Sequence, residues 1–308
     1  MARVVVVTPN PAIDVTYRVT QQIVGDTHRV LQTAKSPGGK GVNVARALDS
    51  LGIEAVSVLP IGGASGQWML ASLRELGLLV ASSPIAGETR TTVTVADDGA
   101  HPTVFSEPGP NVSPPEWELF ASELRRQLVG AAMLILSGSL PHDSSATLVA
   151  DWVAEAHRAG IPVLVDATGD ALLAGARAGA EILKPNLREL LDTTGATTAE
   201  RGIRVLLDLG ARLVVVSRGV GGIIASDSER DYSVGAITGV SGNPTGAGDA
   251  ATAGLAAALI EGRTIGEALR WAAALGAAAV LRPVAGEVDL DAFHTFLGDT
   301  TDSNGASE

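Results

Sequence analysis

The chain has 308 residues, of which 46% are apolar and 18% charged, with 36 glycines and no cysteine. Its formal net charge of −12 disfavours a nucleic-acid or anionic-membrane partner, and the absence of thiols excludes disulfides, thiolate catalysis and cysteine metal sites. Because there is no N-terminal export segment and no apolar run of the ~20 residues that cross a bilayer, we expect a cytoplasmic protein.

Short apolar runs rich in β-branched residues alternate with helical patterns along most of the chain. The runs predict strands that are buried on both faces, at Val4–Val7, Val56–Leu59, Met133–Leu136, Val163–Val165, Ile182–Leu183 and Leu213–Val216. Helical patterns lie between most of them, for example at Val42–Leu51, Gln67–Leu76, Glu116–Leu128, Thr147–Ala159 and Ala199–Leu209. This alternation predicts an α/β fold with a doubly wound, mainly parallel sheet.

Two segments, around residues 13–35 and 89–106, depart from this alternation. In the second, Thr91–Val95 and Thr103–Phe105 flank Asp97-Asp98-Gly99, which predicts a β-hairpin. We therefore expect a small β lid formed by residues 12–36 and 88–106. The large α/β domain would comprise residues 1–11, 37–87 and 107–299, and the polar tail at 300–308 is predicted to be disordered.

A glycine-rich loop at residues 243–249 leads directly into a small-residue helix predicted at 250–260. At such a helix start, main-chain N–H groups converge on an anion, as phosphoryl transfer requires. The groups in question belong to Gly246, Ala247 and Gly248. Asp249 would then lie within reach of an attacking hydroxyl and act as its base. Taken alone, the loop is equally compatible with an ordinary aspartate-capped helix.

A second glycine-rich loop, at residues 37–43, also opens a helix. It is not a Walker A loop, because Ala34 and Gly41 stand where that motif has glycine and a hydroxyl residue. Closely spaced glycines let a ligand approach the backbone, and a lysine and an asparagine add charge and hydrogen bonds. The loop therefore predicts a different anion or polyol site at Gly38, Gly39, Lys40 and Asn43, with a flexible turn as the alternative.

Other polar residues follow predicted strands and should share the carboxyl edge of the sheet, where open α/β folds bind ligands. There Asp14 can accept two sugar hydroxyls or cap a turn. Asn186 and Glu189 lie three residues apart at a helix start and suit a Mg²⁺ held largely through water, although this spacing is more often a helix cap.

The glycines that follow Ser217 would let a nucleotide lie close to the main chain. Gly-x-Gly-x-x-Gly spacing is absent because Ile224 occupies the last position, which disfavours a dinucleotide enzyme.

Taken together, several motifs resemble those of the PfkB, or ribokinase-like, sugar kinases. They are Asn-Pro-Ala-Ile-Asp at 10–14, Gly-Gly-Lys-Gly-Val-Asn at 38–43, Ser-Gly-Ser-Leu-Pro at 137–141, Lys-Pro-Asn-Leu-Arg-Glu at 184–189 and Gly-Ala-Gly-Asp at 246–249. The resemblance extends from residue 3 to about residue 298. It implies a ribokinase-like fold, with ATP and Mg²⁺ bound by the large domain.

Within that family the chain is similar to the phosphosugar branch of 1-phosphofructokinase, tagatose-6-phosphate kinase and the minor 6-phosphofructokinase, through Gly-Glu-Thr-Arg at 87–90, Arg29 and Ser139. The branch implies ATP-dependent phosphorylation of a phosphosugar hydroxyl, foremost fructose 1-phosphate to fructose 1,6-bisphosphate. Tagatose 6-phosphate and fructose 6-phosphate are the alternative substrates. A kinase of an unphosphorylated sugar and a non-catalytic sugar-phosphate sensor are less favoured, the sensor because Asp249 and its loop are intact.

The resemblance also implies a role for each matching residue. Asp249 would deprotonate the acceptor hydroxyl, and Glu189 would act through Mg²⁺ and water with Asn186 beside it. The sugar would contact Asp14, Gly38, Gly39, Lys40 and Asn43, and its phosphate Arg29, Arg90 and Ser139. The transferring phosphoryl group would face Gly246, Ala247 and Gly248, and ATP would contact Lys184, Asn186, Ser217, Gly219, Gly221 and Gly222.

Some positions depart from the branch. Thr27 stands where some members have lysine, His28 where asparagine is common, and Arg218 where leucine is usual. Many relatives bind a monovalent cation such as K⁺ behind the anion site, and the stretch at residues 277–286 leaves this question open. Lid strands in the branch often pair between subunits, so the resemblance implies a homodimer through the lid.

Overall fold

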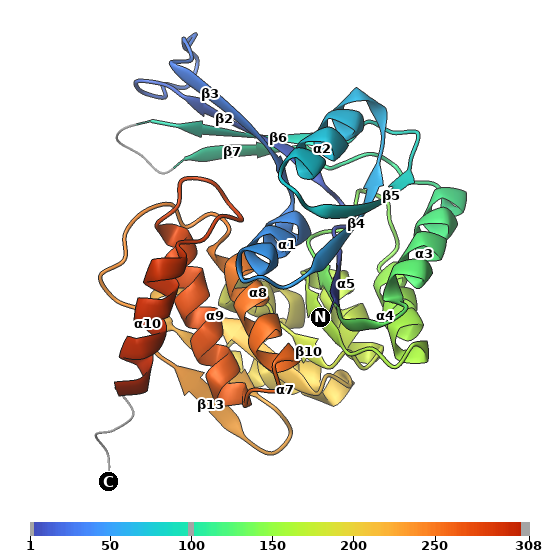
Figure 1. Ribbon diagram of the computed structural model, residues 1–308, viewed down its shortest axis with the longest axis vertical. Coiled ribbons are helices and arrows are strands. Elements are labelled where there is room, and N and C mark those ends of the chain that lie inside the picture. Colours follow the sequence, from blue (N-terminus) through green and yellow to red (C-terminus); the bar gives the residue numbers. More distant parts are fainter. Residues whose placement is uncertain (1–2, 98–101, 303–308) are drawn as a thin grey trace.

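A nine-stranded sheet lies at the centre of the computed structural model, which describes residues 3–97 and 102–302 (Figure 1). The strand order is β13-β12-β11-β10-β9-β8-β1-β4-β5. Parallel pairing joins β1 (Arg3–Val7), β4 (Ala55–Ile61), β5 (Leu79–Pro84), β8 (Ala131–Ser137), β9 (Val163–Asp166), β10 (Ile182–Leu183) and β11 (Leu213–Ser217). Two antiparallel strands, β12 (Ile223–Ser226) and β13 (Asp231–Val234), complete one edge. The predicted α/β fold with a mainly parallel sheet is thus confirmed.

Helices cover both faces of this sheet, and the two cores explain why its central strands are largely apolar. In β1, Val5 and Val7 face one core while Val4 and Val6 face the other. The first core packs against α3 (Pro114–Leu128), α4 (Thr147–Arg158), α5 (Gly169–Arg177), α6 (Leu187–Thr194) and α7 (Ala199–Leu209). The second packs against α1 (Lys40–Ser50), α8 (Ala247–Ile260), α9 (Ile265–Val280) and α10 (Leu290–Asp302).

A third, smaller core lies beside the second sheet. It joins α2 (Gly63–Glu75) to α1 and β4 through Met69, Val42 and Leu59.

No helix in the part of the chain that the structure describes is long and apolar enough to cross a membrane.

The second sheet has four strands and projects from the body of the molecule (Figure 1). Its order is β3 (Gln32–Gly38), β2 (Ala12–Arg18), β6 (Arg90–Ala96) and β7 (Thr103–Ser106). The antiparallel β6–β7 pair confirms the predicted hairpin, although residues 98–101 of its turn lie outside the described residues. In the register, Ala12 pairs with both Gly38 and Arg90, so three distant segments meet where the lid joins the large sheet.

Element boundaries differ from the sequence prediction in two places that matter. Helix α8 begins at Ala247 rather than at residue 250, because the turn from Pro244 already closes a hydrogen bond to the Ala247 N–H. At the other end of the chain, α10 continues to Asp302, so the predicted disordered tail is wrong at residues 300–302. The rest of that tail, residues 303–308, lies outside the described residues.

Candidate active site

The carboxyl ends of the parallel strands form one cavity of about 350 Å³, bordered by the first turns of α1 and α8. An adjoining cavity of about 210 Å³ shares Lys40, Arg90 and Glu189 with it and extends to Ser139. The larger cavity brings together most of the residues singled out in the sequence, namely Asp14, Gly39, Lys40, Asn43, Arg90, Lys184, Asn186, Glu189, Ser217, Gly246, Gly248 and Asp249. It also contains Asp166 and Thr245, which were not among the predicted site residues.

The first turn of α8 presents main-chain N–H groups to the larger cavity. Gly246, the N-cap, has φ of 84°, and a Cβ there would come within 2.9 Å of Ala285 Cβ, so the turn requires glycine. The N–H groups of Gly246 and Gly248 have no acceptor within the described part of the chain. Ala247 differs from the prediction, because its N–H donates to the Pro244 carbonyl at 3.2 Å and the residue lines neither cavity.

The first turn of α1 also borders the cavity, beside α8. Its N-cap, Gly39, has φ of 107° and offers no side-chain acceptor, so the helix start is open to a ligand. Gly38 lies under Asp14, where any Cβ would overlap the Asp14 carboxylate. The two glycines are therefore needed to bring the backbone close to Asp14 and to the end of β1.

Asp249 is a buried carboxylate, 7% exposed, in the first turn of α8. Its Oδ2 accepts a hydrogen bond of 2.8 Å from Asn43 Nδ2, which comes from α1. Burial, assisted by the negative charge of Asp166, raises the pKa of Asp249 to about 7 against the opposing effect of Asn43. A carboxylate with this pKa is well matched to accepting a proton near neutral pH.

Asp166 links the segments around the cavity, although it was not among the predicted site residues. Its Oδ1 lies 3.5 Å from Lys40 Nζ, and its Oδ2 lies 3.2 Å from Lys184 Nζ and accepts a 2.7 Å hydrogen bond from Thr252 Oγ1. Burial opposes ionisation, but the two lysines and Thr252 hold the pKa of Asp166 below its usual value. The available signal was its position directly after the predicted strand 163–165, the same signal that drew attention to Asp14.

Lys40, the first residue of α1, joins the loop at residues 37–43 to residues that follow β9 and β10. Its Nζ donates to Glu189 Oε1 at 3.1 Å and also faces Asp166. Burial lowers the pKa of Lys40, but Asp166 and Glu189 more than offset it and hold the pKa above its usual value. The lysine is therefore charged throughout the physiological pH range.

Asn186 and Glu189 form the helix cap that the sequence also allowed. The Asn186 N–H donates to Glu189 Oε2 and the Glu189 N–H donates to Asn186 Oδ1, each at 2.9 Å. Only Glu189 Oε1 is left to face the cavity, where it meets Lys40. The described residues contain no group of three acidic or histidine side chains placed to hold a metal, so a magnesium role for this pair stays a prediction.

Asp14 and Arg90 form the lid side of the cavity. Burial raises the pKa of Asp14 to about 6, and the positive charge of Arg90 limits the rise. The Arg90 guanidinium donates to Ser106 Oγ at 2.7 Å, to the Glu107 carbonyl at 2.9 Å and to the Asn10 carbonyl at 3.2 Å. These bonds hold the arginine across the base of the lid, with one side open to both cavities.

Several predicted residues are not brought to the cavities. Arg29 is exposed in the loop between β2 and β3 and lines neither cavity. Its neighbours Thr27 and His28 line neither cavity either. His28 contacts the main chain of Ile23 through Nε2 and so holds this loop.

The glycine loop after Ser217 also lies outside both cavities, at Gly219, Gly221 and Gly222. Gly222 is required by the backbone, because its φ is 77° and a Cβ would overlap the Val234 carbonyl oxygen. Arg218 donates to the Gly221 carbonyl at 2.7 Å and braces the loop from outside.

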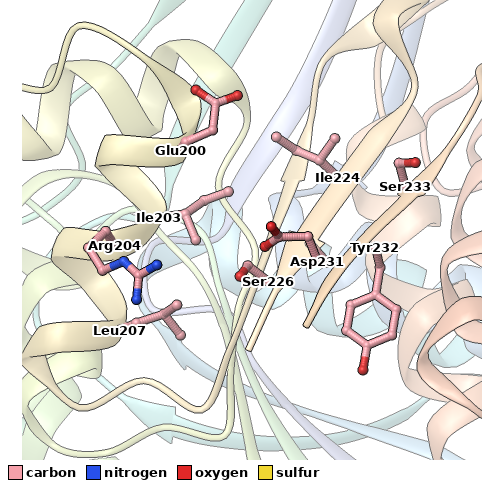
Figure 2. Close-up of a pocket in the computed structure, with 10 residues that line it drawn as sticks. Glu200, Ile203, Arg204, Leu207, Ile224, Ser226, Asp231, Tyr232 and Ser233 are labelled. Atoms are coloured by element: carbon pink, nitrogen blue, oxygen red, sulfur yellow. The ribbon is translucent and has the colours of Figure 1, made fainter. Parts of the chain in front are cut away.

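A further pocket of about 290 Å³ lies between α7 and the antiparallel strands β12 and β13 (Figure 2). Its apolar wall comes from Ile203, Leu207 and Ile224. Arg204 and Asp231 are exposed, and no ion pair joins the charged side chains of this pocket within the described ranges. We refer to it as the edge pocket.

Comparison with known proteins gives a consistent set of relatives. The family model described as pfkB family carbohydrate kinase matches residues 2–291. The ATP-dependent 6-phosphofructokinase isozyme 2 of Mycobacterium tuberculosis is 33% identical over 91% of this chain and 85% of its own length. The tagatose-6-phosphate kinase of Staphylococcus epidermidis is 29% identical over 94% of this chain and 96% of its own length.

Solved structures of phosphofructokinase-2 from Escherichia coli share the fold. Its complex with potassium has a TM-score of 0.90 and 27% identity, and a tetrameric inhibited form has a TM-score of 0.89 and 28% identity. Each match covers 98% of this chain and 100% of the other.

Proposed function

The chain belongs to the pfkB family of carbohydrate kinases, and on that premise we propose that it transfers the γ-phosphoryl group of ATP to a primary hydroxyl of a ketohexose monophosphate. Fructose 1-phosphate is the first proposed substrate, and fructose 6-phosphate and tagatose 6-phosphate are the alternatives that the named relatives favour. In each case the phosphate and the reacting hydroxyl are at opposite ends of the sugar, and the product is a 1,6-bisphosphate.

The observation that carries the proposal is the position of Asp249. Its carboxylate is buried beside the open N–H groups of Gly246 and Gly248 and shares one cavity with Asp14 and Lys40. An acceptor hydroxyl between Asp249 and those N–H groups would have a base on one side and an anion site on the other.

The adjoining cavity supports binding of the substrate phosphate. Arg90 and Lys40 border it, and the Ser139 hydroxyl is at its far side. Two cations and a hydroxyl around one small space suit a phosphate monoester, because hydrogen bonds between charged partners are stronger than neutral ones. Arg29 is too remote in this chain to join them, so its phosphate contact is not part of the proposal for a single chain.

The opposite wall of the larger cavity supports binding of the nucleotide. Lys184, Asn186 and Ser217 follow neighbouring strands there, and Lys184 is held by Asp166. The donor set fits Mg²⁺ that is bound chiefly by phosphates and water, since Glu189 Oε1 is one carboxylate oxygen rather than an enclosed metal site. When bound, Mg²⁺ would neutralise charge on the transferring phosphoryl group.

The proposed chemical step is an in-line transfer of the γ-phosphoryl group. The acceptor oxygen forms a bond to the γ-phosphorus, and the bond to the oxygen bridging the β- and γ-phosphorus atoms breaks to release ADP. The hydroxyl proton passes to Asp249, while the N–H groups of Gly246 and Gly248 face the phosphoryl oxygens. Alignment and charge stabilisation, rather than a covalent intermediate, account for catalysis.

A panel assay of ADP release tests the proposal. Fructose 1-phosphate, fructose 6-phosphate and tagatose 6-phosphate are compared with fructose, ribose and a no-sugar control at equal concentration. We expect turnover with at least one phosphorylated ketohexose and little with the unphosphorylated sugars. Turnover of unphosphorylated sugars alone would contradict the role of Arg90, and binding of phosphosugars without any ADP release would indicate a sensor.

The assembly and the monovalent cation are also open to test. The lid exposes apolar side chains at Leu31, Val104 and Phe105, which favours a homodimer formed through lid strands. The E. coli relative was solved in complex with potassium, and we propose K⁺ dependence by analogy. Light scattering of the protein and of a Phe105→Glu variant measures whether the chain is a dimer. Replacing KCl by tetramethylammonium chloride in the ADP assay measures whether turnover depends on K⁺.

A further inference from the structure

A single ammonium group lies between carboxylates that serve different parts of the proposed site. Lys40 Nζ is 3.1 Å from Glu189 Oε1 and 3.5 Å from Asp166 Oδ1. Glu189 belongs to the nucleotide side and is the residue proposed to face Mg²⁺, whereas Lys40 belongs to the loop proposed to contact the sugar. Lys40 therefore occupies the place where a metal would be attracted.

Two partly buried carboxylates need a nearby cation, because an unpaired charge in such a position is strongly destabilising. The Glu189 and Asp166 side chains are only 19% and 3% exposed. Lys184 satisfies the other oxygen of Asp166, which leaves Lys40 as the cation that these two carboxylates share within the described part of the chain. A divalent cation beside Glu189 would supply the positive charge that these carboxylates need, and it would repel the ammonium group of Lys40.

The Lys40 side chain has free space beside it, whereas that of Lys184 is enclosed by protein. The Lys40 side chain is 39% exposed and that of Lys184 only 5% exposed. Lys40 also borders the adjoining cavity with Arg90, so a position nearer to the acceptor phosphate is open to its flexible four-carbon stem.

We propose that Lys40 is an exchangeable counter-ion: it neutralises Glu189 and Asp166 while no metal is bound, and metal binding displaces it toward the acceptor side. The inference rests on the proposed function for the position of the metal at Glu189. Its consequence is that a loaded metal–nucleotide makes a cation available to the anionic sugar, so the two substrates bind with positive coupling.

Binding of Mn²⁺ to the nucleotide-free protein, followed by electron paramagnetic resonance or calorimetry, tests the exchange without any turnover. Removing the competing ammonium in Lys40→Met should tighten the Kd for Mn²⁺ by about tenfold or more, since charge repulsion at this range is large even in a partly aqueous site. Lys40→Arg keeps a cation in place and should bind Mn²⁺ as weakly as the unmodified chain. Lys40→Gln gives the same comparison if the methionine variant does not fold.

Two controls locate the effect. Lys35→Met removes a lysine that lies over Trp68, outside both cavities, and should leave Mn²⁺ binding unchanged. Adding Glu189→Gln to Lys40→Met should abolish the tightening. The proposal is overturned if Lys40→Met binds Mn²⁺ no better than the unmodified chain, or if the gain survives loss of Glu189. Tightened Mn²⁺ binding in a chain that phosphorylates no sugar would refute the proposed function alone.

Discussion

The active-site cavity and the edge pocket are similar in volume, about 350 and 290 Å³, but differ in how deeply their charged side chains are buried. In the active-site cavity, Asp166 and Lys184 are 2% and 4% exposed, and each has an oppositely charged partner. In the edge pocket, Asp231 and Arg204 are exposed beside apolar side chains of α7 and β12 (Figure 2). Only the first region holds ionised groups away from water.

The difference teaches that volume alone does not identify a functional site in this fold. Burial makes charges expensive to maintain, so a cluster of buried, paired charges at strand ends indicates a site with a chemical purpose. The edge pocket lies between α7, which packs against β11, and the antiparallel strands β12 and β13. Each region contains an aspartate and an arginine, which allows matched substitutions.

The largest expected effect is the difference between two aspartate substitutions, one in each region. Asp249→Asn should lower kcat by about 10²- to 10⁴-fold, because it removes the general base while preserving shape and the contact with Asn43. ATP affinity measured by calorimetry should be nearly unchanged. Asp231→Asn makes the same chemical change in the edge pocket and should leave kcat within about twofold. Equal losses in both variants would break the distinction between the two regions.

The next largest expected effect is the dependence of kcat/KM on pH. Since burial raises the pKa of Asp249 to about 7, kcat/KM for the phosphosugar should fall about tenfold per pH unit below 7. In Asp166→Asn the midpoint should move to lower pH, because the negative charge of Asp166 favours protonation of Asp249. A midpoint that stays near the ordinary aspartate value in the unmodified chain would show that Asp249 is not the base.

The two arginines should differ by a smaller factor. Arg90→Met should raise KM for the phosphosugar by about 10- to 100-fold, because it removes charged hydrogen bonds to the phosphate. The KM for ATP should change little. Arg204→Met in the edge pocket should leave both KM values within about twofold. A rise in KM for ATP alone in Arg90→Met would place that arginine with the wrong substrate.

The smallest expected effect is on stability. The pKa of Asp249 is raised on folding, so its contribution to stability is fully present below about pH 4 and is lost as pH rises through about 7. Asp249→Asn should therefore increase the free energy of unfolding at pH 8 by on the order of 2 kcal/mol, with a smaller gain at pH 5. Thermal unfolding at both pH values checks this, with Asp231→Asn expected to show no gain. A gain that is independent of pH would point to a packing effect instead.

The fold was largely predictable because most parallel strands of the large sheet are short runs buried on both faces, with the edge strand β5 as the exception. The same regularity explains why polar residues that follow such runs, including Lys184, Asn186 and Ser217, meet in one cavity. The antiparallel edge was less readable. Strand β13 alternates exposed and half-buried residues over only Asp231–Val234, which is too short for a clear periodic signal.

The failures have local causes. Ala247 was expected to bind an anion, but the turn at Pro244 takes its N–H. The motif around Gly219 shows where a turn is needed and does not show which side of it a ligand occupies. Thr252 was missed because its contact with Asp166 joins α8 to β9, which no local pattern in the sequence reports. Asp166 was missed although it directly follows a predicted strand.

The register of the lid has a mechanical consequence. Gly38 ends β3, Arg90 begins β6, and both pair with Ala12, two residues before Asp14 on the strand between them. The strands that form the lid thus carry Asp14, Gly38 and Arg90, three of the residues proposed to hold the sugar phosphate, while Asp249 belongs to α8 on the large sheet. Any tilt of the lid must move these substrate-binding residues relative to Asp249. Covering the cavity and aligning the reacting atoms are therefore one and the same displacement.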